Sequence, residues 1–337
     1  MKPATRIRVG ILASLALTGL AGCSRSAPES RAPLRKLRVT SSSHLSWGPL
    51  LLANEAGYFR QEGLEIEWVH LPRGQEALVA LLSGDVDVVP APLGPALFSA
   101  IARGGAARMV AGMNYLPKDG CTYHAVVLGP GLTPANAVRK LHRMDVSPEG
   151  GSRYLTSRML ATQGMNVDSL DTVKLPTAVI VHSLETGAID AAALTEPTVT
   201  RASRSGTVWL KAQDVTPGFQ WAAISFGDRL LHKDRETGVR FLTAFRRGVE
   251  LFNAGKTPQN LELLRKATDE DPAILERSCW PAFRADARIN LESVLAYQQW
   301  AKDQHYLDQI ATAAELWDSS FVVASDTALA HRRALHP

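Results

Sequence analysis

One seven-residue pattern, Leu-x-x-Gly-x-[Val/Ile]-Asp, occurs twice in this chain and limits its possible folds more than any other feature. The first copy runs from Leu81 to Asp87 (LLSGDVD) and the second from Leu184 to Asp190 (LETGAID). In each copy an apolar, helix-like stretch ends at a Gly that suits a left-handed helix terminus, and a short apolar strand follows. The same helix–turn–strand unit in two places predicts two similar lobes with a ligand-binding cleft between them.

Strand and helix patterns alternate along much of the chain. Short apolar runs at Leu37–Thr40, Val86–Val89, Ala125–Leu128 and Ile189–Ala192 predict strands that are separated by helices. Such alternation favours an α/β fold with mainly parallel sheets that are covered on both faces. From Asp234 onward the spacing is helical, so we expect a helical C-terminal region that packs on the first lobe.

The first 22 residues have the pattern of a secretory signal. Three basic residues precede the apolar run Val9–Leu20, and residues 1–22 contain no acid. This run is shorter than the roughly 20 residues that a membrane-spanning helix needs. The sequence Leu-Ala-Gly-Cys23 follows and resembles the bacterial lipoprotein box, in which the Cys is lipidated; an ordinary secretory peptide with an incidental Cys is the alternative. The Ser-, Pro- and Arg-rich residues after Cys23 predict a flexible tether.

Charge and cysteine content exclude several classes of protein. Removal of residues 1–22 takes away three basic residues and leaves 34 Lys and Arg against 33 Asp and Glu. Without a basic run, this balance does not predict a nucleic-acid partner. Cys121 and Cys279 remain after Cys23, and outside the cytoplasm they could form a disulfide or stay as buried free thiols. Two cysteines without clustered His predict no metal site, and we expect no cofactor.

The predicted sheets also indicate where a ligand would bind. In open α/β sheets, ligands bind beyond the carboxyl ends of the strands, where backbone amides and helix N-termini meet. Applied to the loops after the predicted strands, and to the strand that leads back to the first lobe, this rule selects a set of candidate ligand-binding residues. They are Ser42, Ser43, His44, Trp47, Pro92, Leu93, Asn114, Gly151, Ser152, Glu196 and Trp221.

Several of these candidates have a purely structural alternative. Ser152 is expected to cap a helix, and the amides around Gly151 would then seat an oxyanion. Trp47 and Trp221 would line the cleft or stack on a planar ligand, with core packing as the alternative. Glu196 would favour a ligand with an amino group if it points inward, and otherwise it fixes its own loop. The first-lobe candidates include no Arg or Lys, which argues against a small, multiply charged anion held by salt bridges alone.

A further set of motifs connects the chain to a known family. The motifs are Trp47–Phe59 (WGPLLLANEAGYF), Gly63-Leu64, Gly74 ahead of Ala77–Asp87, Val146–Ser152, Gly187–Asp190 and Glu196-Pro197. With them the chain resembles the solute-binding proteins of ABC importers for nitrate, sulfonates, taurine and thiamine-precursor pyrimidines. The resemblance implies the two-lobed type II periplasmic binding protein fold. After the signal (1–22) and tether (23–36), the first lobe would combine 37–121 with 228–337, and the second would be 122–227.

The function that the resemblance implies is capture of a small organic molecule, by hinge closure near 121–124 and 224–228. The ligand would be a sulfonate, a taurine-like zwitterion, nitrate or a pyrimidine. We expect a monomer outside the cytoplasm, in the periplasm or at the cell surface, anchored to a membrane through Cys23 and serving an ABC permease and its ATPase. The alternatives are a ligand sensor that signals to a receptor and an enzyme on the same fold. Cys121 and His124 are the only catalytic candidates, and because they would point to opposite faces of a strand we predict no catalytic residue.

Overall fold

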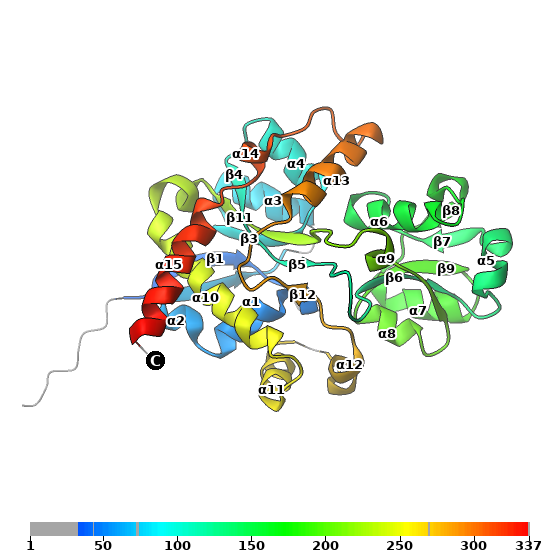
Figure 1. Cartoon of the computed structure of the whole chain (residues 1–337), viewed down its shortest axis with the longest axis horizontal. Coiled ribbons are helices and arrows are strands. Elements are labelled where there is room, and N and C mark those ends of the chain that lie inside the picture. Colours follow the sequence, from blue (N-terminus) through cyan, green and yellow to red (C-terminus); the bar gives the residue numbers. More distant parts are fainter. Residues whose placement is uncertain (1–32, 43, 72–73, 269, 336–337) are drawn as a thin grey trace, which may run out of the picture. The chain divides into compact units, whose positions relative to one another are not determined.

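Two mixed sheets organise the described part of the chain, and each is the centre of one lobe (Figure 1). The computed structural model describes residues 33–42, 44–71, 74–268 and 270–335. The first sheet has the order β2 (Leu64–Val69), β1 (Arg35–Thr40), β3 (Val88–Pro92), β11 (Ala222–Gly227) and β4 (Ala107–Gly112). The second has the order β10 (Thr207–Lys211), β6 (His124–Leu128), β9 (Ala191–Thr195), β7 (Arg143–Asp145) and β8 (Asp171–Val173). We call the elements around these sheets the first lobe and the second lobe.

Each sheet contains one strand that runs against the other four. In the first sheet this is β11, which pairs antiparallel with both β3 and β4. In the second it is β6, which pairs antiparallel with both β10 and β9. The remaining pairs, such as β1 with β2 and β7 with β9, are parallel. The mainly parallel α/β fold expected from the sequence is therefore confirmed. In each lobe, the antiparallel strand is the one that the chain forms when it arrives from the other lobe.

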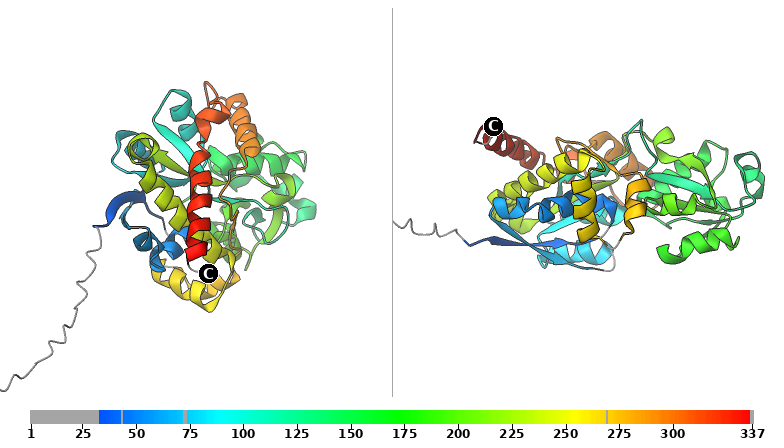
Figure 2. Two further views of the ribbon diagram at one scale, coloured as in Figure 1. Left: turned by 60° about the vertical axis from the view of Figure 1, so that its left-hand side comes forward. Right: turned by 90° about the horizontal axis from the view of Figure 1, so that it is seen from below.

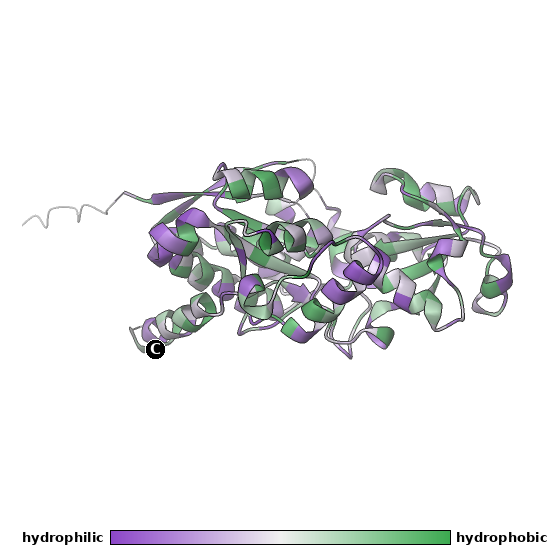
Figure 3. Cartoon of the chain, turned by 90° about the horizontal axis from the view of Figure 1, so that it is seen from above, coloured by the Kyte–Doolittle hydropathy of each residue, from purple (hydrophilic) through white to green (hydrophobic). Residues whose placement is uncertain are grey.

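Helices cover the sheets. Those between the strands of the first lobe are η1 (Leu45–Trp47), α1 (Gly48–Glu55), α2 (Tyr58–Gln61), α3 (Gly74–Ser83) and α4 (Pro95–Ala102). The second lobe contains α5 (Pro134–Lys140), α6 (Gly150–Ala161), η2 (Val167–Ser169), α7 (Thr177–Glu185), α8 (Thr198–Ala202) and α9 (Ala212–Val215). The C-terminal region contains η3 (Arg229–Lys233), α10 (Arg235–Asn253), α11 (Pro258–Ala267), α12 (Pro272–Arg277), α13 (Leu291–Asp303), α14 (Ala313–Leu316) and α15 (Ser320–Leu335). The long C-terminal helix α10 carries both apolar and polar residues along its length, as an amphipathic surface helix requires (Figure 3).

The repeated pattern forms the same structure in both lobes. Gly84 and Gly187 adopt left-handed backbone conformations, with φ of 81° and 74°. The aspartate that ends each copy then binds one residue of a neighbouring strand through its backbone and its carboxylate. Asp87 N–H donates to Arg38 O at 2.8 Å and its Oδ2 accepts from Arg38 N–H at 2.9 Å. Asp190 makes the same two bonds to Arg143, each at 2.8 Å.

Two crossovers join the lobes and are hydrogen-bonded to each other. The first crossover (residues 113–123) contains β5 (Asn114–Tyr115), which pairs with β12 (Ala282–Phe283). The second crossover (residues 216–221) runs beside it, where Trp221 N–H donates to Asn114 O at 3.1 Å. The Gln220 side chain also donates to Met113 O and Asn114 O, each at 3.3 Å. The expected lobe division assigned β11 to the second lobe and a hinge to 224–228, but β11 is hydrogen-bonded on both sides within the first sheet. β11 is therefore part of the first sheet, and the hinge near 224–228 stays a prediction.

The C-terminal helices pack largely on the first lobe, as expected. Helix α10 contacts α1, α2 and α15, and α15 also contacts β4 (Figure 2). Helices α10 and α1 approach so closely that a Cβ at Gly248 would lie 2.1 Å from Pro49 O. Two C-terminal helices also reach the second lobe, because α12 contacts α8 and α13 contacts α6. The C-terminal region therefore braces the lobes as well as covering the first one, and 34–337 forms one compact unit.

Candidate functional site

A cavity of about 360 Å³ lies between the two lobes and is lined by both. The first lobe contributes α3, the carboxyl end of β3 and the start of α4, and the second contributes the residues around the start of α6. Among the described lining residues, Glu149 is the only charged one and most of the others are aliphatic or small. We call this space the apolar cavity, and its lining includes Gln75, Pro92, Pro95, Leu97, Ser147 and Glu149. Its place at the carboxyl ends of β3 and β7 agrees with the general rule for open sheets.

The start of α6 faces this cavity and differs from the sequence expectation. The helix begins at Gly150, which has φ of 86°, so Ser152 is its third residue and not its cap. Glu149 occupies the N-cap position without a capping side-chain bond. The first-turn amides of a helix have no intrahelical partner, and together with the helix dipole they attract negative charge. An oxyanion could therefore bind here only close to the Glu149 carboxylate.

Polar side chains without partners are buried where the crossovers meet the lobes. Asn114 and His124 are fully buried, and neither His124 nitrogen has a hydrogen-bond partner in the described structure. The Asn114 amide makes no hydrogen bond within 3.5 Å there, although it faces the Tyr123 hydroxyl and interacts with it weakly. The Tyr123 hydroxyl bonds to Ser46 Oγ at 2.5 Å. The Trp221 ring lies 5.2 Å from the His124 ring and 6.1 Å from the Tyr123 ring, centroid to centroid. We call Ser46, Asn114, Tyr123, His124 and Trp221 the polar floor.

The polar floor is uncharged at neutral pH. Burial lowers the pKa of His124 to about 3 and raises the pKa of Tyr123 to about 12. A neutral imidazole offers one donor and one acceptor, and an amide offers both. Each buried polar group without a partner costs about 1–3 kcal/mol. Such a cost is usually offset by something that the group binds, which makes Asn114 and His124 candidates for contact with a polar ligand.

A second cavity of about 170 Å³ lies between the loop after β1, the loop after β9 and the segment around α12. We call it the polar cavity; its lining includes His44, Thr195, Glu196, Thr198, Arg201 and Glu270. The Glu196 carboxylate is nearly saturated: Oε2 accepts from Thr200 N–H at 3.0 Å, and Oε1 accepts from the Thr200 hydroxyl at 2.9 Å and from Cys279 N–H at 3.1 Å. Burial raises the pKa of Glu196. These hydrogen bonds support the structural alternative for Glu196, in which its carboxylate fixes its own loop.

The structure places five of the eleven predicted site residues at the two cavities or in the polar floor. Pro92 lines the apolar cavity, and His44 and Glu196 line the polar cavity. Asn114 and Trp221 belong to the polar floor. Whether any of them contacts a ligand stays a prediction.

The other predicted residues make contacts within the protein or lie outside the described residues. Leu93 is buried and its N–H donates to Trp221 O at 2.9 Å. Trp47 is buried, and its indole N–H has no partner in the described structure. The Ser42 hydroxyl accepts from His44 N–H, within its own loop. A Cβ at Gly151 would lie 3.8 Å from the Trp221 ring, so the first turn of α6, which contains Gly151 and Ser152, lies near the polar floor. Ser43, Cys23 and the expected signal lie outside the described residues.

Sequence reasoning missed several lining residues for two different reasons. Ser147 and Glu149 follow β7, so the same strand-end rule could have selected them. Glu270 comes from the helical C-terminal region, and no local pattern places that region against the second lobe. His124 was considered only as a catalytic base, although the structure buries it beside Trp221.

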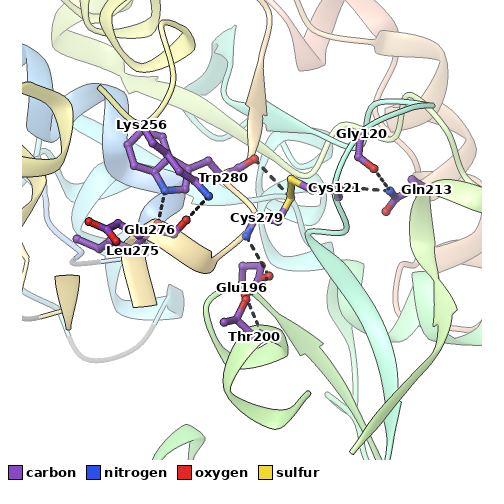
Figure 4. Close-up of a disulfide and its surroundings, with 10 residues drawn as sticks. All are labelled: Gly120, Cys121, Glu196, Thr200, Gln213, Lys256, Leu275, Glu276, Cys279 and Trp280. Atoms are coloured by element: carbon purple, nitrogen blue, oxygen red, sulfur yellow. Dashed lines mark hydrogen bonds between the residues drawn. A yellow bond between two sulfur atoms is a disulfide. The ribbon is translucent and has the colours of Figure 1, made fainter. Parts of the chain in front are cut away.

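The two remaining cysteines form a disulfide between Cys121 and Cys279, which decides between the two alternatives that the sequence left open (Figure 4). Cys121 belongs to the first crossover, and Cys279 follows α12. A bridged Cys121 cannot act as a thiol nucleophile beside His124. Among the described residues there is also no group of three or more His, Cys, Asp or Glu side chains that could hold a metal ion. In the same part of the chain every helix is too short or too polar to span a membrane.

Comparison with known proteins identifies both a family and a fold. The profile of the NMT1-like family matches residues 30–247, more than half of the chain. No curated protein matched the chain by sequence. Solved structures match the fold over most of the chain.

Three of these structures illustrate the likeness. The ligand-binding component of an ABC-type import system from Staphylococcus aureus, with zinc bound, has a TM-score of 0.71 at 11% identity and covers 86% of this chain and 98% of its own. The alkanesulfonate-binding protein of Xanthomonas axonopodis pv. citri, bound to MOPS, has a TM-score of 0.68 at 19% identity, covering 85% and 99%. The periplasmic nitrate-binding protein of Synechocystis has a TM-score of 0.68 at 13% identity, covering 88% and 89%. At such identities the likeness shows the fold alone, which is that of the type II periplasmic binding proteins.

Proposed function

We propose that this chain, which belongs to the NMT1-like family, is the extracytoplasmic solute-binding protein of an ABC importer. One observation carries this proposal: the apolar cavity is lined by both lobes, and it lies in the same interlobe region as buried polar groups that lack partners. A site divided between two lobes suits capture of a small molecule, since contacts to both lobes stabilise the closed state. The three structural relatives described above are a ligand-binding component of an ABC-type import system, an alkanesulfonate-binding protein and a nitrate-binding protein, which supports this function.

The ligand in this proposal is a small organic molecule with an apolar part. Sulfonates, taurine-like zwitterions, nitrate and pyrimidines are the classes to compare. The aliphatic lining of the apolar cavity favours an organic body over a bare inorganic anion such as nitrate. The polar floor favours a group that offers both a donor and an acceptor, as the Asn114 amide and the neutral His124 ring can satisfy both.

The proposal also includes the bounds of the two lobes, the partner proteins and the membrane anchor. The first lobe would comprise about 37–112 with 222–337, and the second about 124–215, which move about the two crossovers. The permease and its ATPase would be the partners. The Leu-Ala-Gly-Cys23 sequence supports attachment to a membrane through a lipid on Cys23.

Calorimetric titration of the purified protein with alkanesulfonates, taurine, nitrate and pyrimidines tests the function. At least one organic member is expected to bind and to change the fluorescence of Trp221. The Asn114→Leu variant should bind that ligand at least tenfold more weakly, because it loses about 1.5 kcal/mol or more of hydrogen bonding. Val138→Ala on α5, where Val138 is exposed, is the matched control and should bind normally. Equal affinity in wild type and Asn114→Leu would refute the assigned site.

A further inference from the structure

The Cys121–Cys279 disulfide links the first crossover to the C-terminal region. Cys121 is in the first crossover, close to the start of β6 at His124, so it sits at the base of the second lobe. Cys279 belongs to the C-terminal region, in the segment that follows α12. The bond therefore adds a third covalent connection to the two crossovers that already link the lobes.

The segment that carries Cys279 also holds the polar cavity together. Cys279 N–H donates to Glu196 Oε1, and Glu196 in turn binds Thr200 (Figure 4). Glu270, near the start of the same segment, pairs with Arg201 of α8. We call residues 270–279 the latch segment. It contacts the second lobe at Glu196 and Arg201, and the disulfide fixes its far end.

The disulfide is open to attack from solvent. Cys121 is exposed, and an open hollow of about 330 Å³ is lined by both cysteines together with Lys256 and Arg277. Lys256 and Arg277 line this hollow together with the Glu196 carboxylate, and Lys256 Nζ donates to Glu276 O at 2.6 Å. Positive charge in the hollow favours the thiolate that leaves when the bond breaks and attracts an incoming thiolate. A disulfide with both features differs from a buried structural one, which a reductant cannot reach.

We propose that Cys121–Cys279 is a reversible redox site whose partner is a dithiol reductant, and that its oxidised form locks the latch segment against Glu196. The first thiolate of the dithiol attacks Cys121 Sγ, the protein S–S bond breaks, and Cys279 leaves as a thiolate. The second thiol of the dithiol then attacks the mixed disulfide and releases Cys121. Two electrons and two protons pass to the protein, and the dithiol becomes a disulfide.

Reduction would loosen the polar cavity. Without the bond, only non-covalent contacts keep Cys279 N–H at the buried Glu196 carboxylate, so the latch segment opens more often. Oxidation fixes the latch segment again.

Hydrogen–deuterium exchange on the folded protein tests the latch without any ligand. The amides of Thr200 and Cys279 should exchange at least tenfold faster after treatment with dithiothreitol, whereas amides in the core strand β3 should not change. The Cys121→Ser/Cys279→Ser variant should exchange as the reduced wild type does and should not respond to dithiothreitol. Unchanged exchange at Thr200 and Cys279 in the reduced wild type would overturn the latch.

The rate at which dithiothreitol reduces the disulfide tests the redox site separately from the latch segment. Lys256→Gln/Arg277→Gln keeps the disulfide and should be reduced several-fold more slowly by dithiothreitol than wild type is. If the native wild-type bond breaks only as fast as the whole protein unfolds, Cys121–Cys279 is a structural bridge and the redox site is refuted. Absence of any ligand binding in both redox states would refute the proposed function, while the exchange experiment would still decide the latch.

Discussion

Acidification should destabilise this protein through one buried residue, His124. The ring is fully buried beside Trp221, its nitrogens have no partner in the described structure, and burial lowers its pKa from 6.5 to about 3. Because the folded-state pKa lies below the unfolded one, the contribution of neutral His124 to stability is complete above pH 6.5. It is lost progressively as the pH falls from 6.5 towards 3.

The expected loss follows from this shift. Each pKa unit corresponds to about 1.4 kcal/mol, so lowering the pH from 7.5 to 4.5 should cost about 3 kcal/mol through His124 alone. The full shift is worth about 5 kcal/mol below pH 3. Glu196 acts in the opposite direction, since burial raises its pKa and acid then favours the folded state. A variant that lacks only the imidazole is therefore needed to isolate the effect.

His124→Phe keeps a flat ring against Trp221 but cannot be protonated. Urea unfolding, followed by tryptophan fluorescence at pH 7.5 and 4.5, would measure the free energy of unfolding of both proteins. At pH 7.5 the variant should be at least as stable as wild type, because it removes two buried polar atoms without partners. At pH 4.5 it should be more stable than wild type by a further 3 kcal/mol or so.

The control for this experiment is His182→Gln, on the exposed side of α7. Its free energy of unfolding should follow that of wild type at both pH values. If the difference between wild type and His124→Phe stays the same at pH 7.5 and 4.5, the imidazole is not buried in a neutral state and the reasoning about the polar floor fails.

Two further predictions concern the repeated aspartate and the N-terminal cysteine. Asp190→Ala leaves the N–H groups of His142 and Arg143 without their carboxylate acceptor and should lower the free energy of unfolding by about 1–3 kcal/mol; Asp190→Asn, which keeps one acceptor oxygen, should lose less, and equal losses would contradict the proposed role. Cys23→Ser should move the protein from the membrane fraction to the soluble fraction of the cells that produce it. A wild-type protein that is already soluble would contradict the lipid anchor.

Local patterns in the sequence were sufficient to predict the repeated units. A Gly that ends a helix, an apolar strand and an Asp lie within seven residues, so the backbone preference of Gly84 or Gly187 acts directly on its neighbours. The strand-end rule selected Pro92 and Asn114, which the structure places at the apolar cavity and in the polar floor, and their contact with a ligand stays a prediction. It did not resolve where α6 begins, because Gly150 and Ser152 are both plausible helix starts.

Only the tertiary structure shows which side chains are buried and which residues that are distant in sequence pair with each other. The roles of Glu196 and His124 could not be read from their neighbours in sequence: Cys279, which is 83 positions away, occupies the Glu196 carboxylate, and Trp221 covers the His124 ring. Likewise, the bond between Cys121 and Cys279 spans 158 positions. The sequence by itself determined the local units and the family, since backbone preferences act over a few residues. Only the packing of both lobes and the C-terminal region decided which polar groups are satisfied, because that depends on atoms brought together from the whole chain.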